Sequence, residues 1–358
     1  MTTVLVTTPT LLKYSYKLTG VVPFPFTTSK PTKISQVVSH IWPIFFCLYF
    51  ISIYLFYTSV NNETKIFSYI NFLVYHWNVL YMVVYVVMLH KRSTKVKKLL
   101  TEISKIQLIT NNNSKSNERY VRIIQIVTLV CLLVTFLLRN IPLTYTIYFM
   151  YPCTISTFDN LFINDVLNEF CNKFKTINRK FENIVAKFGT SESDFNIEII
   201  QKLSHHHYNL VSLVLEMIKQ FEITLIVAIT QTFIVMVDSV YTVTFLIFNK
   251  RVLTFHFGCN LFFVHYAICW LFNLIRKFSE TQEETNKAGS YVHCIWNKYS
   301  LRGNIEKKMR YLELVSLRLL NTKVNFTASG CFNLDWTLLQ TMIASITTYV
   351  VILIQFQI

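Results

Sequence analysis

The sequence has little glycine, few acidic residues and none of the short motifs that mark common enzymes. Only 6 of its 358 residues are glycine, and 19 Asp and Glu stand against 34 Lys and Arg, giving a net charge of +15. No nucleotide-binding loop, HExxH, GxSxG or protein-kinase signature occurs. No stretch alternates in the pattern of a membrane β-barrel strand. We therefore expect a helical protein that is not an enzyme and needs no cofactor.

The metal-ligand residue types also lack a binding pattern. The eight cysteines include no CxxC, and most lie inside apolar runs, where Cys behaves as a small hydrophobe. His205, His206 and His207 are adjacent, so on a helix they point in different directions and cannot all bind one metal ion. We expect these histidines on a solvated helix face and no metal site.

Hydrophobic residues are abundant, at 53% of the chain, and aromatic residues make up 15%. A soluble domain of this size would expose too much apolar surface, so the predicted fold class is an all-α polytopic membrane protein. A helix needs about 20 apolar residues to cross a bilayer. Seven apolar runs are present, at 37–60, 66–89, 123–138, 140–158, 223–248, 252–275 and 336–358. If the third and fourth runs form one helix, six spans result.

Positive charge is distributed very unevenly among the connecting segments. Of the 34 Lys and Arg, 29 fall in segments 1–36, 90–120, 159–222 and 276–335. Positively charged loops stay cytoplasmic, so seven spans place the N-terminus inside and the C-terminus outside. The charge then has a topological origin, and no nucleic-acid partner is expected. The first span should serve as the targeting signal. Asn62, in an outer Asn-Glu-Thr sequence, is a glycosylation candidate.

Two inner segments are too long to be simple connections. In 159–222 and 305–323, apolar residues recur at helical spacing between charged ones. We expect the fourth and fifth spans to continue below the membrane as helices. The cytoplasmic parts should pack as a helical bundle, with breaks at 189–196 and 302–304.

A few polar and aromatic side chains lie within the apolar runs. Asp238 is the only acid inside a span away from its ends, and it suits a ligand contact or a structural hydrogen bond equally. The others in outer halves or near the midplane are His76, Trp77, Tyr145, Tyr148, Tyr241 and His256. Such residues suit a small-ligand pocket and also an ordinary interface belt. We take these seven as candidate ligand-binding residues.

The last apolar run carries a polar stripe. Its members follow at mostly three- or four-residue steps and share one helix face: Thr341, Ser345, Thr348, Tyr349, Ile352, Gln355 and Phe356. In an oligomer with this face inward, the stripe describes a water-filled pore with a hydrophobic gate. The alternative is a helix–helix seam held by hydroxyl and amide groups.

The end of the chain resembles the insect gustatory receptor family. Thr348-Tyr349, five hydrophobic residues and Gln355-Phe356 match the family signature TYhhhhhQF at every fixed position. Residues 323–335 are similar to the family's approach to its last helix, and the specific match covers roughly 310–358. The resemblance implies an inverted seven-helix subunit of a tetrameric, ligand-gated, non-selective cation channel.

The resemblance also implies a role for each segment. The last helix lines the shared pore, with Tyr349, Gln355 and Phe356 matching the motif and Ser345 and Ile352 assigned from the helix face. The chain then divides into a cytoplasmic segment 1–36, a six-helix ligand-binding region 37–275 with inner extensions in 159–222, cytoplasmic anchor helices 276–335, and the pore helix 336–358.

The implied partners are a small-molecule tastant, permeant cations, the lipid bilayer and further gustatory receptor subunits in a homo- or heterotetramer. The implied location is the plasma membrane of sensory neurons. The aromatic, weakly charged outer half favours bitter or other plant-derived molecules, with sugar as a possible ligand.

Two other classes fit less well. A G-protein-coupled receptor needs its N-terminus outside, which would put the 29 inner basic residues on the wrong side. Its NPxxY motif is also missing from the last span. A membrane transporter should carry several paired charges within its spans, whereas Asp238 stands nearly alone.

Overall fold

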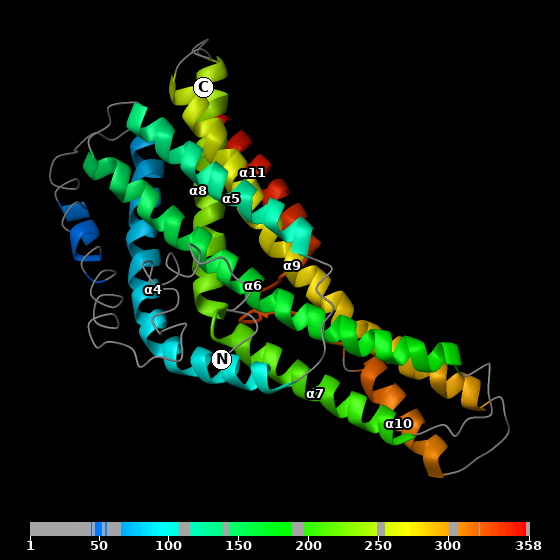
Figure 1. Cartoon of the computed structure of the whole chain (residues 1–358). Helices are drawn as coiled ribbons and strands as arrows, with labels where there is room; N and C mark the ends of the chain where they lie inside the picture. The colour runs from blue at the N-terminus through cyan, green and yellow to red at the C-terminus, as the bar shows by residue number, and fades with distance from the viewer. Residues whose placement is uncertain are drawn as a thin grey trace.

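The structure is a computed structural model of the chain. It describes residues 44, 47–51, 54–55, 66–106, 115–138, 143–187, 197–248, 255–300, 307–321 and 323–355. These residues are helical apart from short connections and one two-stranded hairpin, so the predicted all-α class is confirmed (Figure 1). The elements are α4 (Ile66–Lys105), α5 (Lys115–Leu138), α6 (Leu143–Lys187), α7 (Ile197–Lys219), α8 (Glu222–Phe248), α9 (Phe255–Ser300), α10 (Lys307–Asn321), β1 (Thr327–Ala328), β2 (Phe332–Asn333) and α11 (Trp336–Gln355).

Two very long helices organise the molecule. α6 has 45 residues and α9 has 46, and they lie side by side. At a rise of about 1.5 Å per residue, each is about 70 Å long, more than twice the thickness of a hydrocarbon core. We call the part of the molecule that holds their C-terminal halves, up to Lys187 and Ser300, the inner part, after the orientation that the charges predict. α7 and α10 pack against their inner halves, at the lower right of Figure 1.

Three described helices are long and apolar enough to cross a membrane: Glu222–Phe248, Phe257–Ser300 and Trp336–Gln355. The first contains the predicted fifth run, and the other two overlap most of the sixth and seventh runs. Shorter apolar helices lie at His76–Leu89 and Arg122–Cys131. Most of the first predicted run lies outside the described residues. The count of seven spans and their orientation stay predictions.

The third and fourth predicted runs fall in two separate helices. α5 ends at Leu138 and α6 begins at Leu143, with residues 139–142 outside the described part of the chain. The two runs belong to separate helices that contact each other, as the seven-span prediction expects. The predicted breaks at 189–196 and 302–304 also lie outside the described residues, between α6 and α7 and between α9 and α10 respectively.

The continuation of the spans differs from the prediction in one respect. The helix of the fourth predicted run continues to Lys187 as α6, as expected, but the helix of the fifth run does not extend before Glu222. Gln220 and Phe221 form a turn, with Phe221 N bonded to Ile218 O at 2.8 Å, and the separate helix α7 precedes it. The sixth span continues instead, because α9 keeps its helical backbone through its charged inner half.

The hydrophobic core follows the helical periodicity of the sequence. Phe170, Phe174, Ile177 and Phe181 on α6 are all 0% exposed. Steps of three and four residues put them on one helix face. Burying a large apolar side chain contributes about 1.5–3 kcal/mol before the conformational entropy cost. This row therefore accounts for a large part of the attraction among the inner helices.

A hairpin absent from the sequence prediction leads into the last helix. β1 and β2 pair antiparallel, with Ala328 opposite Phe332. Ser329 and Gly330 take φ values of 46° and 73°, a left-handed conformation that glycine adopts without steric cost. Asp335 then caps α11, since its Oδ1 accepts a bond from Thr337 N at 2.9 Å. The hairpin sets the point from which α11 rises.

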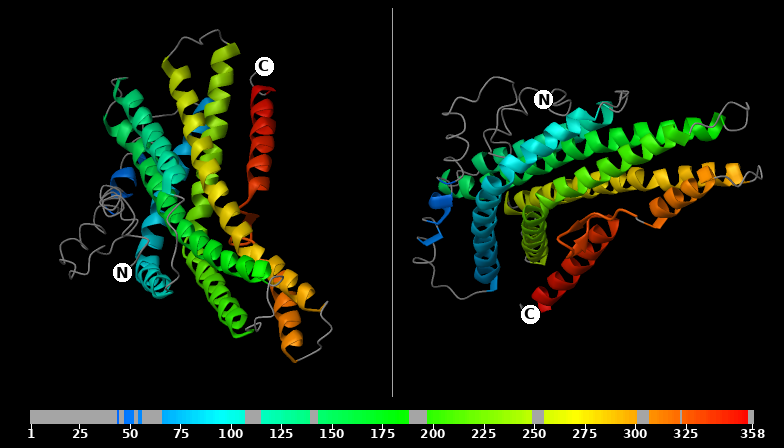
Figure 2. Two further views of the ribbon diagram at one scale, coloured as in Figure 1. Left: turned by 45° about the vertical axis from the view of Figure 1, so that its right-hand side comes forward. Right: turned by 90° about the horizontal axis from the view of Figure 1, so that it is seen from below.

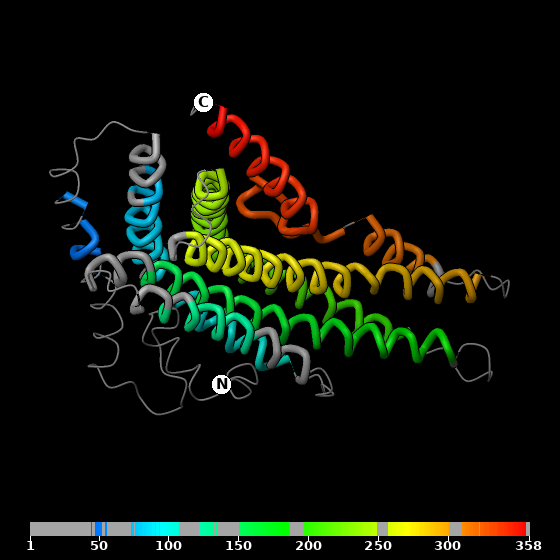
Figure 3. Tube along the Cα trace, turned by 90° about the horizontal axis from the view of Figure 1, so that it is seen from above, coloured from blue at the N-terminus to red at the C-terminus, as the bar shows by residue number. Residues whose placement is uncertain are grey.

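The last helix stands at the edge of the molecule. α11 contacts α8 and α9, and Figure 2 (left) shows it beside these two helices. Seen from above in Figure 3, α11 lies on one side of α9, and α5 and α6 lie on the other. One flank of α11 is therefore left without a neighbour from the described part of the chain.

Candidate functional site

The face of α11 that packs against its own chain is apolar, and its residues recur at a regular spacing. Leu338, Met342, Ile346 and Val350 are buried and recur every four residues. Ile346 and Val350 form a cluster with Tyr241 and other residues of α8 and α9. This face attaches the helix to its own chain.

The polar stripe runs beside this buried face, along one edge of the exposed side of α11. Thr341, Thr348, Tyr349, Ile352 and Gln355 are exposed, and Ser345 is half-buried. Tyr349 is 52% exposed, although its ring meets the edge of Phe233 with centroids 6.0 Å apart. Phe356 lies outside the described residues. Most of the stripe is therefore uncovered by the described part of the chain.

The threonines of the stripe use their hydroxyl hydrogens locally. Thr341 Oγ1 donates to Leu338 O at 2.9 Å, and Thr348 Oγ1 donates to Ala344 O at 3.0 Å. Each hydroxyl oxygen keeps lone pairs that face outward from the helix. A row of oxygens on an uncharged helix can replace part of the hydration shell of a cation.

The segment before the hairpin is bound to α9 by side chains. Asn286 Nδ2 donates to Val324 O at 3.1 Å, while Val324 N donates to Asn286 Oδ1 at 2.9 Å. One turn earlier on α9, Gln282 Oε1 accepts a bond from Phe326 N at 3.2 Å. The rings of Phe278 and Phe326 meet at 5.8 Å. These contacts tie the position of α11 to α9.

A charged cluster joins α6 and α9 in the inner part. Glu280 accepts from Lys175 Nζ at 2.6 Å and from Lys277 Nζ at 3.2 Å. Partial burial acts to raise the pKa of Glu280, but Lys277 and Lys175 together outweigh it and lower that pKa to about 2. Lys277 also donates to Asn168 Oδ1 at 2.9 Å. Glu280 is therefore ionised at any physiological pH.

A second ion pair is buried where three helices meet. Arg92 of α4 and Asp159 of α6 form a pair at 2.7 Å, with side chains 3% and 9% exposed. Arg92 also donates to Thr224 Oγ1 of α8 at 3.3 Å and stacks over Phe221, 4.6 Å from the ring centroid. From the sequence, Arg92 was treated only as one of the basic residues of segment 90–120. The sequence carried one signal for the ion pair, because Arg92 and Asp159 each lie just after the end of a predicted apolar run.

The candidate ligand residues do not gather at one place. His76 contacts Tyr54 by a hydrogen bond, and Trp77 donates to Val227 O of α8 at 3.3 Å. Tyr241 is instead fully buried against α9 and α11, and Asp238 is half-buried three residues before it. The side chains of Tyr145, Tyr148 and His256 lie outside the described residues, as does Asn62. His76 and Trp77, on the α4 side of α8, thus lie apart from Asp238 and Tyr241, which lie farther along α8 near α11.

The three adjacent histidines have different surroundings. His205 and His206 are exposed, as expected. His207 is 4% exposed, and its Nε2 bonds Thr285 O of α9 at 2.9 Å, so its placement on a solvated face was wrong. The reason is the helical rotation between neighbours, which turns the third ring toward α9.

The fold defines a helical membrane protein whose last helix carries a polar stripe that the described part of the chain leaves largely uncovered. The family described as 7tm Chemosensory receptor matches residues 11–358, and the chain belongs to that family. The resemblance seen in the sequence is thereby confirmed.

Individual relatives are gustatory receptors of Drosophila melanogaster. The chain is 30% identical over 168 residues to Putative gustatory receptor 28b. The matched stretch covers 44% of this chain and 34% of the relative. It is 33% identical over 133 residues to Putative gustatory receptor 28a, covering 37% and 29% respectively. The match thus spans about a third of the length of these curated relatives.

A solved structure shares the fold. The insect olfactory receptor OR5 from Machilis hrabei, in complex with eugenol, superposes with a TM-score of 0.74 over 97% of both chains. Its sequence identity to this chain is 12%. The likeness therefore concerns the arrangement of the helices.

Proposed function

We propose that the protein is a gustatory receptor subunit that works as a ligand-gated, non-selective cation channel in the plasma membrane of sensory neurons. An extracellular tastant opens it. The observation that carries the proposal is the largely exposed polar stripe of α11, beside a buried apolar face.

The physical argument concerns what the stripe can face. A Gln amide or a row of hydroxyls is costly against lipid unless other protein or water contacts it. Because the described part of the chain leaves the stripe uncovered, other subunits or a water column must supply those contacts. Identical faces meeting around a symmetry axis supply both. Ser345, Tyr349, Ile352, Gln355 and Phe356 then line or gate the pore.

The inner helices offer a place for subunits to meet. On α10, Leu314 is 66% exposed and Leu317 is 48% exposed, beside the charged residues of the same helix. Exposed apolar side chains of this size gain about 25 cal/mol for each Å² that a partner covers. We assign this face to the anchor contact of a homo- or heterotetramer.

The tastant pocket is assigned to the outer halves of the first six spans. The candidates are His76, Trp77, Tyr145, Tyr148, Asp238, Tyr241 and His256, and since His76 and Trp77 lie apart from Asp238 and Tyr241, the two groups are alternative pocket positions. The gustatory relatives and the eugenol-bound neighbour support a small organic ligand. A plant-derived molecule fits the aromatic surroundings better than a sugar does.

The experiment is a whole-cell recording with a panel of plant-derived molecules, in cells loaded with a G-protein inhibitor. A channel gives a current that reverses near 0 mV and persists under the inhibitor. A current abolished by the inhibitor would support the G-protein-coupled alternative. An antibody against a tag placed after Ile358 tests the topology separately, and it should bind intact cells.

A pore-lining substitution adds a test at the residue level. Gln355→Ala should change relative cation permeability while leaving surface expression intact. Gln340→Ala is the matched control, since Gln340 is also exposed on α11 but lies off the stripe, about 120° around the helix from its centre and about 60° from Gln355. Equal effects of the two substitutions would count against pore lining.

A further inference from the structure

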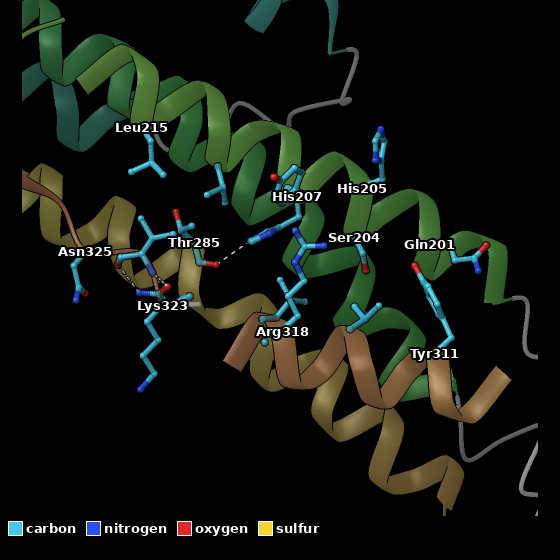
Figure 4. A pocket seen from close by; sticks show the side chains of 17 residues that line it. Gln201, Ser204, His205, His207, Leu215, Thr285, Tyr311, Arg318, Lys323 and Asn325 are labelled. Atoms are coloured by element: carbon cyan, nitrogen blue, oxygen red, sulfur yellow. Dashed lines mark hydrogen bonds between the residues drawn. The ribbon is translucent and has the colours of Figure 1, made fainter. Parts of the chain in front are cut away.

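α9 borders a cavity on two of its sides. The larger, of about 600 Å³, lies against α7 and α10, and Figure 4 shows His207 bonded there to Thr285 O. The smaller, of about 20 Å³, lies between α9, α5 and α6, near the ends of three predicted apolar runs. A space of this size admits about one group as large as a water molecule. The smaller cavity is of interest because one of its charges has no partner within the described part of the chain.

Two of the three cations that line the smaller cavity are paired. Arg122 of α5 forms an ion pair with Asp165 of α6, and Lys277 of α9 forms one with Glu280 at 3.2 Å. Arg276 differs, because no carboxylate of the described residues lies within ion-pair distance of its guanidinium. The positive charge of Arg276 is therefore available to an anion from outside the described part of the chain.

The guanidinium of Arg276 can be reached from outside. Of its nitrogens, only Nε is fully enclosed, and the residue as a whole is half-buried. One turn earlier on α9, Asn273 is 4% exposed and lines the same cavity, and no hydrogen bond of the described residues involves its amide. A buried amide without a partner is costly, so an anion that accepts bonds from both side chains gains at each of them.

The cavity lies where lipid headgroups are expected. Arg122 directly precedes the predicted run 123–138, and Arg276 directly follows the run 252–275. Their apolar neighbours are exposed, with Ile123 at 54% and Phe272 at 47%. In a bilayer, acyl chains cover such side chains, and the headgroup layer beyond them is about 5–8 Å thick. The two arginines therefore lie at the level of the phosphates of the inner leaflet.

We infer that Arg276 and Asn273 bind the phosphate of an anionic lipid of the inner leaflet. One phosphate oxygen enters the cavity and accepts a bond from the Asn273 amide, while a second accepts from the Arg276 guanidinium. The acyl chains lie along Ile123 and Phe272. A guanidinium presents paired donors that match a phosphate, and basic pockets between spanning helices on the cytoplasmic side suit lipid headgroups.

The net charge of the headgroup matters for this site. The choline group of phosphatidylcholine would bring a further cation close to Arg122 and Arg276, whereas phosphatidylglycerol carries the same phosphodiester without one. The inference concerns lipid binding and does not depend on the proposed channel activity.

The test is binding of radiolabelled dioleoylphosphatidylglycerol to the full-length protein in dodecyl maltoside micelles that contain dioleoylphosphatidylcholine, with protein-free micelles subtracted. Saturable binding is expected, and Arg276→Gln should weaken it about fivefold or more, through the loss of one basic group beside a phosphate. Arg179→Gln is the matched control, since Arg179 is exposed on α6 outside the cavity, and it should bind as the wild type does.

Unlabelled competitors identify the source of the phosphate. Dioleoylphosphatidylcholine and dioleoylglycerol should each displace the probe at least about tenfold more weakly than phosphatidylglycerol, because the first adds a cation and the second lacks the phosphate. Equal displacement by either would overturn the inference. Displacement by glycerol 3-phosphate or by chloride as readily as by phosphatidylglycerol would mean a site for soluble anions and would overturn it as well.

A second variant keeps the test decisive if Arg276→Gln does not fold. Asn273→Leu keeps the side-chain volume and removes the amide, so it should weaken binding about threefold or more. Thermal unfolding shows which variants are folded. The inference fails if the wild-type protein shows no saturable binding, or if a folded Arg276→Gln or Asn273→Leu variant binds the probe as tightly as the wild type.

Discussion

The amide side chain of Asn286 forms a closed pair of hydrogen bonds with the backbone of Val324, at 3.1 Å through Val324 O and 2.9 Å through Val324 N. A residue of a neighbouring β-strand would bond the N–H and the C=O of Val324 in the same way, but here a single side chain of α9 makes both bonds. The segment it holds leads through the hairpin to α11. We therefore expect a movement of α9 to shift the start of the last helix through this pair.

Replacing that amide should loosen the connection. Asn286→Ala removes both bonds and leaves a half-buried backbone N–H without its partner, at a cost of about 1–3 kcal/mol. We expect a lower melting temperature and a shifted tastant dose–response. Asn297→Ala, exposed on the same helix, is the control and should change neither. A dose–response identical to wild type in Asn286→Ala would remove this pair from the coupling path.

The buried ion pair should behave as a unit. Asp159→Asn strands the buried Arg92 guanidinium and should destabilise the protein by about 3–5 kcal/mol. The double variant Arg92→Met with Asp159→Asn should recover part of that loss, since no charge remains unpaired. Thermal unfolding in detergent, followed by size-exclusion chromatography, measures both. Additive losses would show that the two residues do not interact.

The α6–α9 charge cluster predicts a pH dependence with a definite sign. The pKa of folded Glu280 is lowered to about 2 from an ordinary value of 4.5. Its contribution to stability is therefore complete above pH 4.5 and is lost as the pH falls toward 2. Glu280→Gln should lower the melting temperature at pH 7 and should lower it less at pH 3.

Glu283→Gln is the matched control for Glu280. Glu283 is 69% exposed and contacts Lys287 at 2.9 Å on the surface of α9. Exposed pairs of this kind contribute about 0–1 kcal/mol, so the control should differ little from wild type at either pH. A deficit of Glu280→Gln that stays constant between pH 7 and pH 3 would contradict the assignment.

Close contact between α9 and α10 depends on one glycine. A Cβ added at Gly289 would lie 3.2 Å from the carbonyl carbon and oxygen of Leu319, whereas one at Gly258 would meet nothing within 4 Å. Gly289→Ala should therefore push α10 outward and destabilise the inner helices. Gly258→Ala should be neutral or stabilise by up to about 1 kcal/mol through helix propensity. Equal melting temperatures for the two variants would show that α10 yields without cost.

Sequence periodicity predicted the features that depend on one helix at a time. The α6 row from Phe170 to Phe181 and the two-sided character of α11 follow from neighbours three or four residues apart. The Asn286–Val324 pair and the Arg92–Asp159 pair join residues 38 and 67 positions apart, which no local pattern specifies. His207 was misplaced for the same reason, since its partner Thr285 lies on another helix.

The central claim is that the polar face of α11 lines a cation pathway. Cysteine accessibility in an open channel tests it most directly, using a positively charged methanethiosulfonate reagent during tastant-evoked current. The account predicts irreversible block in Ser345→Cys and Gln355→Cys. It predicts no block in Thr347→Cys, which is exposed on another face of the helix, or in the wild type with its native cysteines. Block in Thr347→Cys alone, or in none of the three variants despite confirmed surface expression, would contradict it.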